Sequence, residues 1–480
     1  MKIHEKDNVA VAITPINPGE TLAGIPAAEA IPAGHKMALA AIRNGENVMK
    51  YGFPIGRATQ EIAPGQHVHS HNLKTNLRGL EDYSFTPASQ PPASLPATRT
   101  FQGYRRSCGK VGIRNEIWII NTVGCVNKIA ERLVAETNVP GVHTFVHPYG
   151  CSQLGCDHVF TQRLLANLVH HPNAAGVLVL GLGCENNHIE TFKETLGTWD
   201  ANRVKFLNTQ DVQDEIAEGL KTLEELGQYA SGFRRESIPV GELIVGLKCG
   251  GSDGLSGITA NPLVGSFSNR LTAHGGISLL TEVPEMFGAE TLLMNRCTSE
   301  AVFGKTVELI NGFKQYFISH NQEIYENPSP GNKKGGITTL EEKSLGCTQK
   351  GGSSYVTDVL GQNETAKNPG LNLLNGPGND IVAVTNLTAA GAHLILFTTG
   401  RGTPLGAPVP TVKISSNTAL ATAKPHWTDF DAGVLAAGEA MDSLAEEFFD
   451  YIIEVAEGQE TKNEANSYRE ISIFKDGVIL

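Results

Sequence analysis

The sequence lacks the features that would place it in a membrane, outside the cell or on a nucleic acid. It has no hydrophobic run close to the roughly 20 residues that a membrane-spanning helix needs, and its first seven residues, Met1–Asp7, lack the apolar segment of a secretory signal. Basic residues are in the minority, 38 Lys and Arg against 50 Asp and Glu, and no segment concentrates them enough to follow a phosphate backbone. We therefore expect a cytoplasmic protein that binds neither a membrane nor a nucleic acid.

Cysteine is also scarce, with eight in 480 residues. They are too sparse for a disulfide scaffold, and a reducing compartment keeps them as thiols. Each cysteine is then a packing residue, a metal ligand or a reactive group.

Glycine, in contrast, is abundant, and the chain divides by composition. With 52 glycines, many backbone positions are expected in unusual conformations. A Pro-, Ser- and Ala-rich stretch around Phe85–Thr98 can form neither a helix nor a central strand, so it predicts a linker over residues 83–103. Before it, short strand-like runs such as Val9–Ile13, separated by Pro-Gly turns, predict a small β domain over residues 1–82.

After the linker, apolar runs end in glycine-bearing turns and are followed by helical stretches. This alternation indicates an α/β fold with mostly parallel, Rossmann-like sheets, which we divide into subdomains 104–235 and 236–480. The predicted strands include Ile117–Ile120, Val177–Leu180, Leu243–Leu247, Ile277–Thr281 and His393–Phe397, with a helix over residues 261–273.

The β domain contains a run of alternating histidines, His67, His69 and His71. In a strand all three side chains would project from one face, and neutral imidazole suits divalent metals. His35 follows a turn and could converge on the same place. A solvated edge strand with incidental histidines is the alternative.

Several predicted strands end in a Gly-Cys step. Cys125, Cys151 and Cys184 follow glycines in this way, and Cys249 begins a variant of the step. Ligands bind outside the carboxyl ends of parallel strands, so the thiols would meet in one crevice and could hold an iron–sulfur cluster. Buried structural thiols are the main alternative.

A glycine-rich turn, Cys249–Gly257, follows the strand Leu243–Leu247. Consecutive backbone N–H groups in such a turn can bind an anion, but the turn matches neither the P-loop nor the dinucleotide fingerprint, so a carboxylate or polyol is favoured. A tight turn without a ligand is the alternative.

Arg401, between two glycines, is a second candidate to bind a carboxylate. Residues 325–352 are predicted to form a long polar loop of the kind that covers active sites.

Several of these motifs together resemble the altronate dehydratase family, whose sister enzymes are galactarate dehydratase and the sulfolactate sulfo-lyases. The resemblance covers essentially the whole chain and depends on Tyr51–Gly56, His67–Asn72, Gly181–Asn187, Cys249–Gly257 and Tyr325–Asn332. It implies an N-terminal SAF-type, β-clip-like domain joined to an α/β catalytic region. It also implies dehydration of D-altronate to 2-keto-3-deoxy-D-gluconate in hexuronate catabolism, dependent on ferrous iron or manganese.

This reaction needs the substrate carboxylate to be neutralised, the α-proton to be removed and the hydroxyl to depart with assistance. We expect the divalent ion to be held by His35, His69 and His71, and proton transfer to be carried out by His147 or His158. We expect the substrate to contact Gly250, Gly251, Ser252, Asp253, Gly254 and Arg401.

Other functions stay open at this point. The substrate could be a related sugar acid such as galactarate, or the enzyme could be an iron–sulfur hydro-lyase with Cys125, Cys151 and Cys184 as cluster ligands. A sugar-acid binding protein without turnover is a third reading, whereas the missing glycine fingerprint disfavours a dinucleotide-dependent oxidoreductase. We expect the protein to form a homodimer and to bind a small sugar acid as its substrate.

Overall fold

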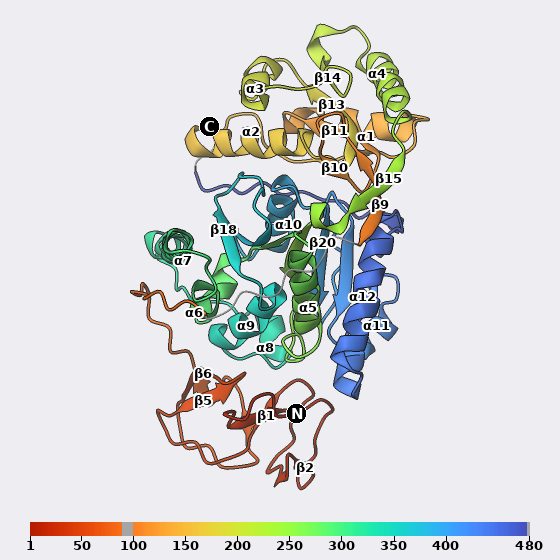
Figure 1. Cartoon of the computed structure of the whole chain (residues 1–480). Coiled ribbons are helices and arrows are strands. Elements are labelled where there is room, and N and C mark those ends of the chain that lie inside the picture. Colours follow the sequence, from red (N-terminus) through yellow and green to blue (C-terminus); the bar gives the residue numbers. More distant parts are fainter. Residues whose placement is uncertain (89–98, 478–480) are drawn as a thin grey trace.

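The computed structural model describes residues 1–88 and 99–477. Figure 1 shows three parts stacked along the molecule, with the N-terminal β domain at one end, the segment around α5 and β20 in the middle, and the segment around α2 and β11 at the other end. Within the described residues, no helix is both long enough and apolar enough to cross a bilayer.

The N-terminal part is built of short antiparallel strands, as predicted. One sheet has the order β1-β4-β7, a second the order β5-β6-β8, and β2 pairs with β3. Their bounds are β1 Val9–Val11, β2 Thr21–Leu22, β3 Ile25–Pro26, β4 Lys36–Ala38, β5 Asn47–Lys50, β6 Phe53–Ala58, β7 His67–Val68 and β8 Leu73–Lys74. Of the linker predicted over residues 83–103, residues 89–98 lie outside the described residues, and from Thr100 the segment already belongs to β9.

The first α/β part has a four-stranded parallel sheet of order β12-β11-β13-β14. Its elements are β11 Glu116–Asn121, α1 Asn127–Glu136, β12 Val142–Thr144, α2 Gly155–Val169, β13 Ala174–Gly181, α3 Ile189–Leu196, β14 Val204–Asn208 and α4 Glu215–Ala230. An antiparallel sheet, β10-β9-β15, links it to the next part and consists of β9 Thr100–Arg105, β10 Val111–Gly112 and β15 Arg235–Pro239.

The second α/β part has a seven-stranded sheet of order β18-β19-β17-β16-β20-β21-β22, with every neighbouring pair parallel. Without the edge strand β18, this is the Rossmann order 3-2-1-4-5-6, which confirms the predicted Rossmann-like sheet. The strands are β16 Ile244–Cys249, β17 Ile277–Leu280, β18 Val356–Leu360, β19 Gly370–Leu374, β20 Leu394–Thr399, β21 Thr411–Ser415 and β22 Phe430–Asp431.

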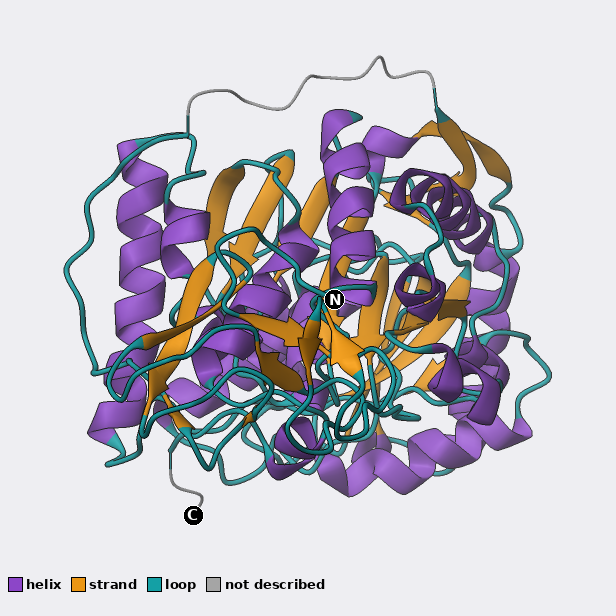
Figure 2. Cartoon of the chain, turned by 90° about the horizontal axis from the view of Figure 1, so that it is seen from below, coloured by secondary structure: helices purple, strands orange, loops and turns teal. Residues whose placement is uncertain are grey.

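Helices flank these strands on both sides (Figure 2). The helices of this part are α5 Ala260–Ala273, α6 Glu290–Met294, α7 Glu300–Ser319, α8 Pro330–Lys334, α9 Leu340–Cys347, α10 Asp380–Ala389, α11 Thr418–Ala423, α12 Met441–Ala456 and α13 Lys462–Ala465. Short 3-10 turns complete the described elements: η1 Gly124–Val126, η2 Thr209–Asp211, η3 Val240–Glu242, η4 Val283–Met286, η5 Thr348–Gly351 and η6 Gly433–Ala437.

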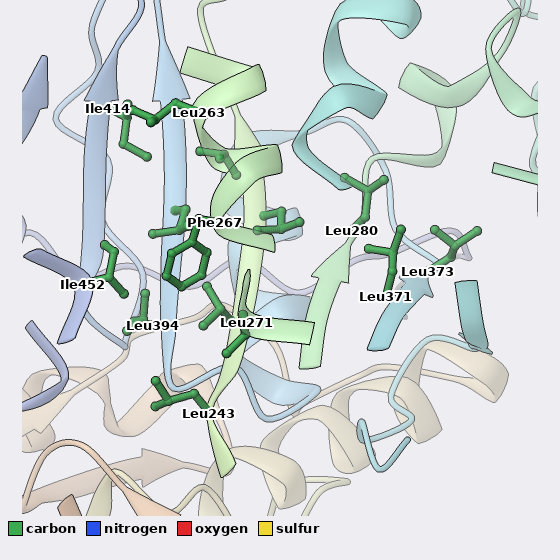
Figure 3. Packing of buried hydrophobic residues seen from close by; sticks show 14 of the residues in the cluster. Leu243, Leu263, Phe267, Leu271, Leu280, Leu371, Leu373, Leu394, Ile414 and Ile452 are labelled. Atoms are coloured by element: carbon green, nitrogen blue, oxygen red, sulfur yellow. The ribbon is translucent and has the colours of Figure 1, made fainter. Parts of the chain in front are cut away.

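Helix α5 packs on the seven-stranded sheet through one apolar face. Leu263, Phe267 and Leu271 recur at a spacing of four, so they lie on the same side of the helix, and each is at most 1% exposed. Figure 3 shows them against Leu394 and Ile414 of the sheet. Burying each such side chain contributes about 1.5–3 kcal/mol, which fixes the start of α5 and the turn before it.

The prediction of a long polar loop over residues 325–352 is wrong. The segment contains α8, α9 and η5, and all of α9 is buried. Its charged residues, Glu341, Glu342 and Lys343, suggested an exposed loop, because their partners lie far away in the chain and cannot be identified from the sequence. Each is buried against a group of opposite charge or a hydrogen-bond donor.

The N-terminal domain is attached to the second α/β part by a buried ion cluster. The carboxylate of Glu342, on α9, accepts from Lys36 Nζ and from Lys50 Nζ, each at 2.8 Å, and all three residues are at most 2% exposed. Lys36 also donates to Gly336 O and Thr338 Oγ1. Both lysines belong to the β domain, whereas Glu342 belongs to the second α/β part. Separating the two parts would therefore leave buried charges uncompensated.

We therefore predict that Glu342→Gln lowers the free energy of unfolding by about 3–5 kcal/mol, since two buried ammonium groups lose their counter-charge. Chemical denaturation of the full chain measures this. The matched control is Glu131→Gln, which removes the partner of Lys128 in an exposed pair and should change stability by less than about 1 kcal/mol. Equal effects of the two variants would contradict the role of the cluster.

The same cluster predicts a pH dependence. Burial alone would raise the pKa of Glu342, but the ammonium groups of Lys36 and Lys50 outweigh it and lower the pKa to about 2. A lowered carboxyl pKa stabilises the fold above the unfolded value of about 4.3, and this contribution is lost as the pH falls towards 2. The stability difference between the unmodified chain and Glu342→Gln should therefore shrink below about pH 4.3, and a constant difference down to pH 2.5 would count against the cluster.

Candidate functional site

The strand order of the seven-stranded sheet reverses between β16 and β20. The chain proceeds from β16 to β17 on one side and later returns to β20 on the other, which makes the carboxyl ends of β16 and β20 the switch point where such sheets bind ligands. The turn beginning at Cys249 follows β16, and Arg401 follows β20. The two motifs predicted to bind a carboxylate therefore meet at one place.

An open cavity of about 460 Å³ lies there. It is lined by Cys249, Gly250, Gly251, Glu285, Glu326, Asn327, Ser329, Asn332, Lys343, Gly378 and Asp380. Most of these side chains are polar or charged, as a polyhydroxy acid would require.

The glycine-rich turn offers fewer free N–H groups than predicted. The N–H groups of Gly250, Asp253 and Gly254 donate to Thr398 O, Ser256 Oγ and Gly335 O. Within the described residues, the N–H groups of Gly251, Ser252 and Gly257 in this turn donate to no other group of the chain, and only Gly251 and Ser252 are adjacent. The anion-binding role of the turn is thereby restricted to two adjacent N–H groups.

Asp253 organises the turn and does not face the cavity. Its carboxylate accepts from Ser256, from Ser416 Oγ at 2.8 Å and from Asn417 Nδ2 at 3.0 Å. A Cβ at Gly400 would lie 2.2 Å from Asp253 Cγ, so a side chain there would force the two loops apart. Asp253 therefore holds the β16 and β20 loops together, which explains its presence in the motif without substrate contact.

Arg401 is placed well for an anion. Its backbone N–H donates to Gly251 O at 3.0 Å, and its exposed guanidinium forms no ion pair within the described part of the chain. A Cβ at Gly331 would come 3.9 Å from Arg401 Cδ and Nε, which places the side chain beside α8. A free guanidinium at the switch point can form paired hydrogen bonds with a carboxylate.

Three histidines meet at the edge of the N-terminal domain, but they are not the predicted three. His35, His67 and His69 offer ring nitrogens that all lie within 4.8 Å of one another, whereas His71 is exposed and stands outside this group. The predicted alternation fails because β7 ends at Val68 and the chain then turns, with Asn72 N–H donating to His69 O. The ring of His71 remains 5.5 Å from that of His67.

The histidine group contacts the second α/β part. His35 Nε2 lies 3.2 Å from Lys334 O and His69 Nδ1 lies 3.1 Å from Thr338 Oγ1, while His35 Nδ1 lies 2.9 Å from His67 Nε2. Helix α8 connects this group to the cavity, because Ser329 and Asn332 line the cavity and Lys334 ends the helix at the histidines. Five helical residues span about 7 Å, so the cavity and the histidine group lie at opposite ends of one short helix.

The chemistry of the three rings suits a divalent metal ion. Burial, with the neighbouring imidazoles and the Lys36 ammonium adding to it, lowers the pKa of His67 to about 4 and that of His69 to about 3. Burial also lowers the pKa of His35. Neutral imidazoles keep the lone pairs that ligate ferrous iron, manganese or zinc, so the residues present fit such an ion.

A second group with metal-like spacing, Cys249, Glu285 and Cys347, lies buried at the bottom of the cavity. Its surroundings are already neutralised, because Lys343 Nζ lies 2.8 Å from Glu285 Oε1 and Lys350 Nζ lies 3.0 Å from Cys249 Sγ. Burial alone would raise the pKa of Glu285, but these ammonium groups and that of Lys248 lower it. We assign this group to an ion network and not to a metal site.

The network was not predicted from the sequence. Lys248 is fully buried and pairs with Glu282 and Asp380, and Lys350 lies 3.6 Å from Glu282. The one local signal is Lys248, a charge directly after the apolar run Leu243–Leu247. Its partners lie more than 30 residues away, so spacing along the chain could not identify them.

The two histidines predicted to transfer protons lie elsewhere. His147 follows β12, and His158 lies on α2, at the end of the molecule opposite the N-terminal domain (Figure 1). His147 is buried, with Nε2 2.8 Å from Asn121 O and Nδ1 accepting from Tyr149 N–H, so neither nitrogen is free. The structure does not bring either ring to the histidine group or the cavity.

The loops that carry the predicted cluster ligands adjoin, because Gly124 N–H donates to Tyr149 O and Ser152 N–H donates to Asn186 Oδ1, but the thiols do not form a metal-binding group. Cys125, Cys151 and Cys184 follow β11, β12 and β13 of the four-stranded sheet, as expected, and all three are exposed. They belong to neither of the two groups with metal-like spacing in the described residues. Cys249 follows a strand of the other sheet, so the prediction that all four thiols share one crevice is wrong.

Comparison with known proteins agrees with this architecture. Three family models match in sequence: the altronate/galactarate dehydratase SAF domain over residues 1–76, the second domain of D-galactarate dehydratase/altronate hydrolase over residues 103–231, and the C-terminal D-galactarate/altronate dehydratase domain over residues 240–479. These matches define a three-part protein of the dehydratase class.

Relatives of known name specify the family further. The chain is 54% identical to altronate dehydratase of Bacillus subtilis (strain 168) and 55% identical to that of Escherichia coli (strain K12), over all of this chain and 99% of each relative. Galactarate dehydratase (L-threo-forming) of Escherichia coli (strain K12) is 34% identical over 96% of this chain and 93% of its own length. The chain belongs to the altronate/galactarate dehydratase family.

The geometry of the histidine group predicts which replacements weaken metal binding. His67→Ala and His69→Ala should each lower the affinity of the chelator-stripped chain for Mn²⁺ at least about tenfold, because each removes a ligand nitrogen. Equilibrium dialysis with metal analysis measures the affinity without an activity assay. His71→Ala is the matched control and should bind Mn²⁺ normally, and a loss as large as that of His69→Ala would contradict the assignment.

Proposed function

We propose that this protein is a hydro-lyase that dehydrates D-altronate to 2-keto-3-deoxy-D-gluconate. The observation that supports this most strongly is the polar cavity at the sheet switch point, which has an unpaired guanidinium beside it and a group of neutral histidines one short helix away. The full-length similarity to altronate dehydratases, higher than to galactarate dehydratase, favours altronate over galactarate.

We assign the substrate carboxylate to the guanidinium of Arg401 and the N–H groups of Gly251 and Ser252. These groups come from the loops after β20 and β16, which Asp253 holds at a constant separation. Positive donors placed here stabilise the negative charge that spreads into the carboxylate when the α-proton leaves.

We assign the metal, ferrous iron or manganese, to His35, His67 and His69. When bound, it would supply a Lewis acid for the departing hydroxyl group. The chain itself orients the rings, because Lys334 O and Thr338 Oγ1 contact His35 and His69.

We assign proton abstraction to Asp380 in place of His147 or His158. Its side chain is 37% exposed, lines the cavity and accepts from Lys248 Nζ at 2.8 Å through Oδ1. A Cβ at Gly250 would lie 2.5 Å from Asp380 Oδ2, so only glycine leaves that oxygen room beside the turn. In this mechanism Oδ2 takes the α-proton and the C3–O bond breaks. The departing hydroxide takes a proton from solvent to become water, and the resulting enol becomes the 2-keto acid.

The reaction is tested with the chelator-stripped, full-length protein under anaerobic conditions, supplied with D-altronate or galactarate and with Fe²⁺, Mn²⁺ or Zn²⁺. We expect 2-keto-3-deoxygluconate from altronate only after Fe²⁺ or Mn²⁺ is added, and slower turnover of galactarate. No keto acid from altronate with any of these metals would overturn the proposed function.

The base is tested by Asp380→Asn, which should lower kcat at least about 100-fold with little change in KM. Glu326→Gln is the matched control, since Glu326 also lines the cavity but makes no ion pair with the network in the described residues. A larger loss in the control than in Asp380→Asn would transfer the role to Glu326.

A further inference from the structure

Two buried cysteines approach each other at the bottom of the cavity. Cys249 ends β16 and Cys347 ends α9, and their sulfur atoms are 3.4 Å apart although 98 residues separate them in the chain. Both are buried, at 2% and 4% exposure. A disulfide requires a sulfur–sulfur distance of about 2.05 Å, so the two sulfurs need to approach by little more than 1 Å.

The charges around the two sulfurs differ. Lys350 Nζ lies 3.0 Å from Cys249 Sγ, Glu285 Oε2 lies 3.1 Å from both sulfurs, and Glu282 Oε2 lies 3.5 Å from Cys249 Sγ. The hydrogen bond with Cys249, together with burial, raises the pKa of Cys347 well above its usual value, so Cys347 keeps its proton. Because Cys249 contacts the Lys350 ammonium group and lines the cavity, its sulfur is the one suited to attack an oxidant, and Cys347 is the one to resolve the product.

Cys249 is also accessible from the cavity. It lines the open cavity together with Gly250, Gly251 and Asp380, whereas Cys347 lies behind it. Cys297, in the same part of the chain, is a buried cysteine that does not line the cavity. Its sulfur lies 3.3 Å from Thr306 Oγ1. Burial raises the pKa of the Cys297 thiol.

We propose that Cys249 and Cys347 form an oxidisable dithiol that reacts with hydrogen peroxide and closes to a disulfide inside the substrate cavity. The Cys249 thiolate attacks one peroxide oxygen, the O–O bond breaks, and hydroxide leaves to solvent. Cys347 then attacks the sulfur of the resulting sulfenic acid, the S–O bond breaks, and the hydroxyl group leaves as water with the thiol proton. The two sulfurs together lose two electrons, which reduce the peroxide.

The disulfide would alter the proposed active site. It removes one of the partners of Lys350 and ties the first residue of the glycine-rich turn to α9. Gly251 O in that turn accepts from both Gly400 N–H and Arg401 N–H, so displacement of the turn would move the carboxylate-binding guanidinium. This effect on activity rests on the proposed function, whereas formation of the disulfide does not.

The dithiol is tested by treating the full-length protein with a small molar excess of hydrogen peroxide, alkylating it under denaturing conditions and mapping its peptides by mass spectrometry. We expect a peptide pair linked through Cys249 and Cys347, which dithiothreitol removes. Cys297→Ser is the matched control and should form the same pair. In Cys347→Ser, dimedone should label Cys249 as a trapped sulfenic acid.

Recovery of both cysteines as free thiols, or of Cys249 as sulfinic acid without a linked pair, would overturn the proposal. Absence of the dimedone adduct in Cys347→Ser would also count against it. Activity is followed in parallel, and it should fall as the linked pair forms and return with dithiothreitol. If the pair forms in a preparation that never dehydrates altronate, the proposed function fails and the dithiol stands.

Discussion

The carboxylate of Glu342, buried between two lysines of another domain, is the interaction on which the site depends. It places the N-terminal domain on the carboxyl edge of the seven-stranded sheet, and with it the three histidines beside α8. A buried charge without its partner is strongly unfavourable, so the two parts have a single relative position and not a range of positions. Backbone contacts support this position, because a Cβ at Gly254 would lie 1.9 Å from Gly34 O.

The same electrostatic principle governs the interior of the cavity. Lys248 and Lys350 lie beside Glu282, Lys343 pairs with Glu285, and all five residues are buried. Mutual compensation of this kind makes such a network rigid. Glu282 has a left-handed backbone, with φ at 68°, which places its carboxylate under Lys248 and shows that this position is constrained by the network.

The sequence predicted the features that depend on interactions between residues close together in the chain, and it missed those that depend on distant residues. The strands at Ile117–Ile120, Val177–Leu180 and His393–Phe397 and the helix at 261–273 are confirmed, because apolar runs and helical spacing are local signals. The helices within 325–352 were missed, because their charged residues are buried by partners that are distant in the chain. The histidine run was recognised as a site. Because the chain turns after Val68, however, the third histidine of the group is His67 and not His71.

The sequence by itself determined the division into a small β domain and a larger α/β region. It also determined the glycine-rich turn after β16 and the guanidinium after β20, since these depend on residue patterns and on where parallel strands end. It also carried the family motifs. Only the tertiary structure decided which groups meet. It separated His147, His158 and the exposed thiols from the cavity, and it brought Asp380, Glu285 and Lys343 to the cavity lining. The physical reason is that compensation of buried charge acts through space, and spacing along a chain does not record which distant partner supplies it.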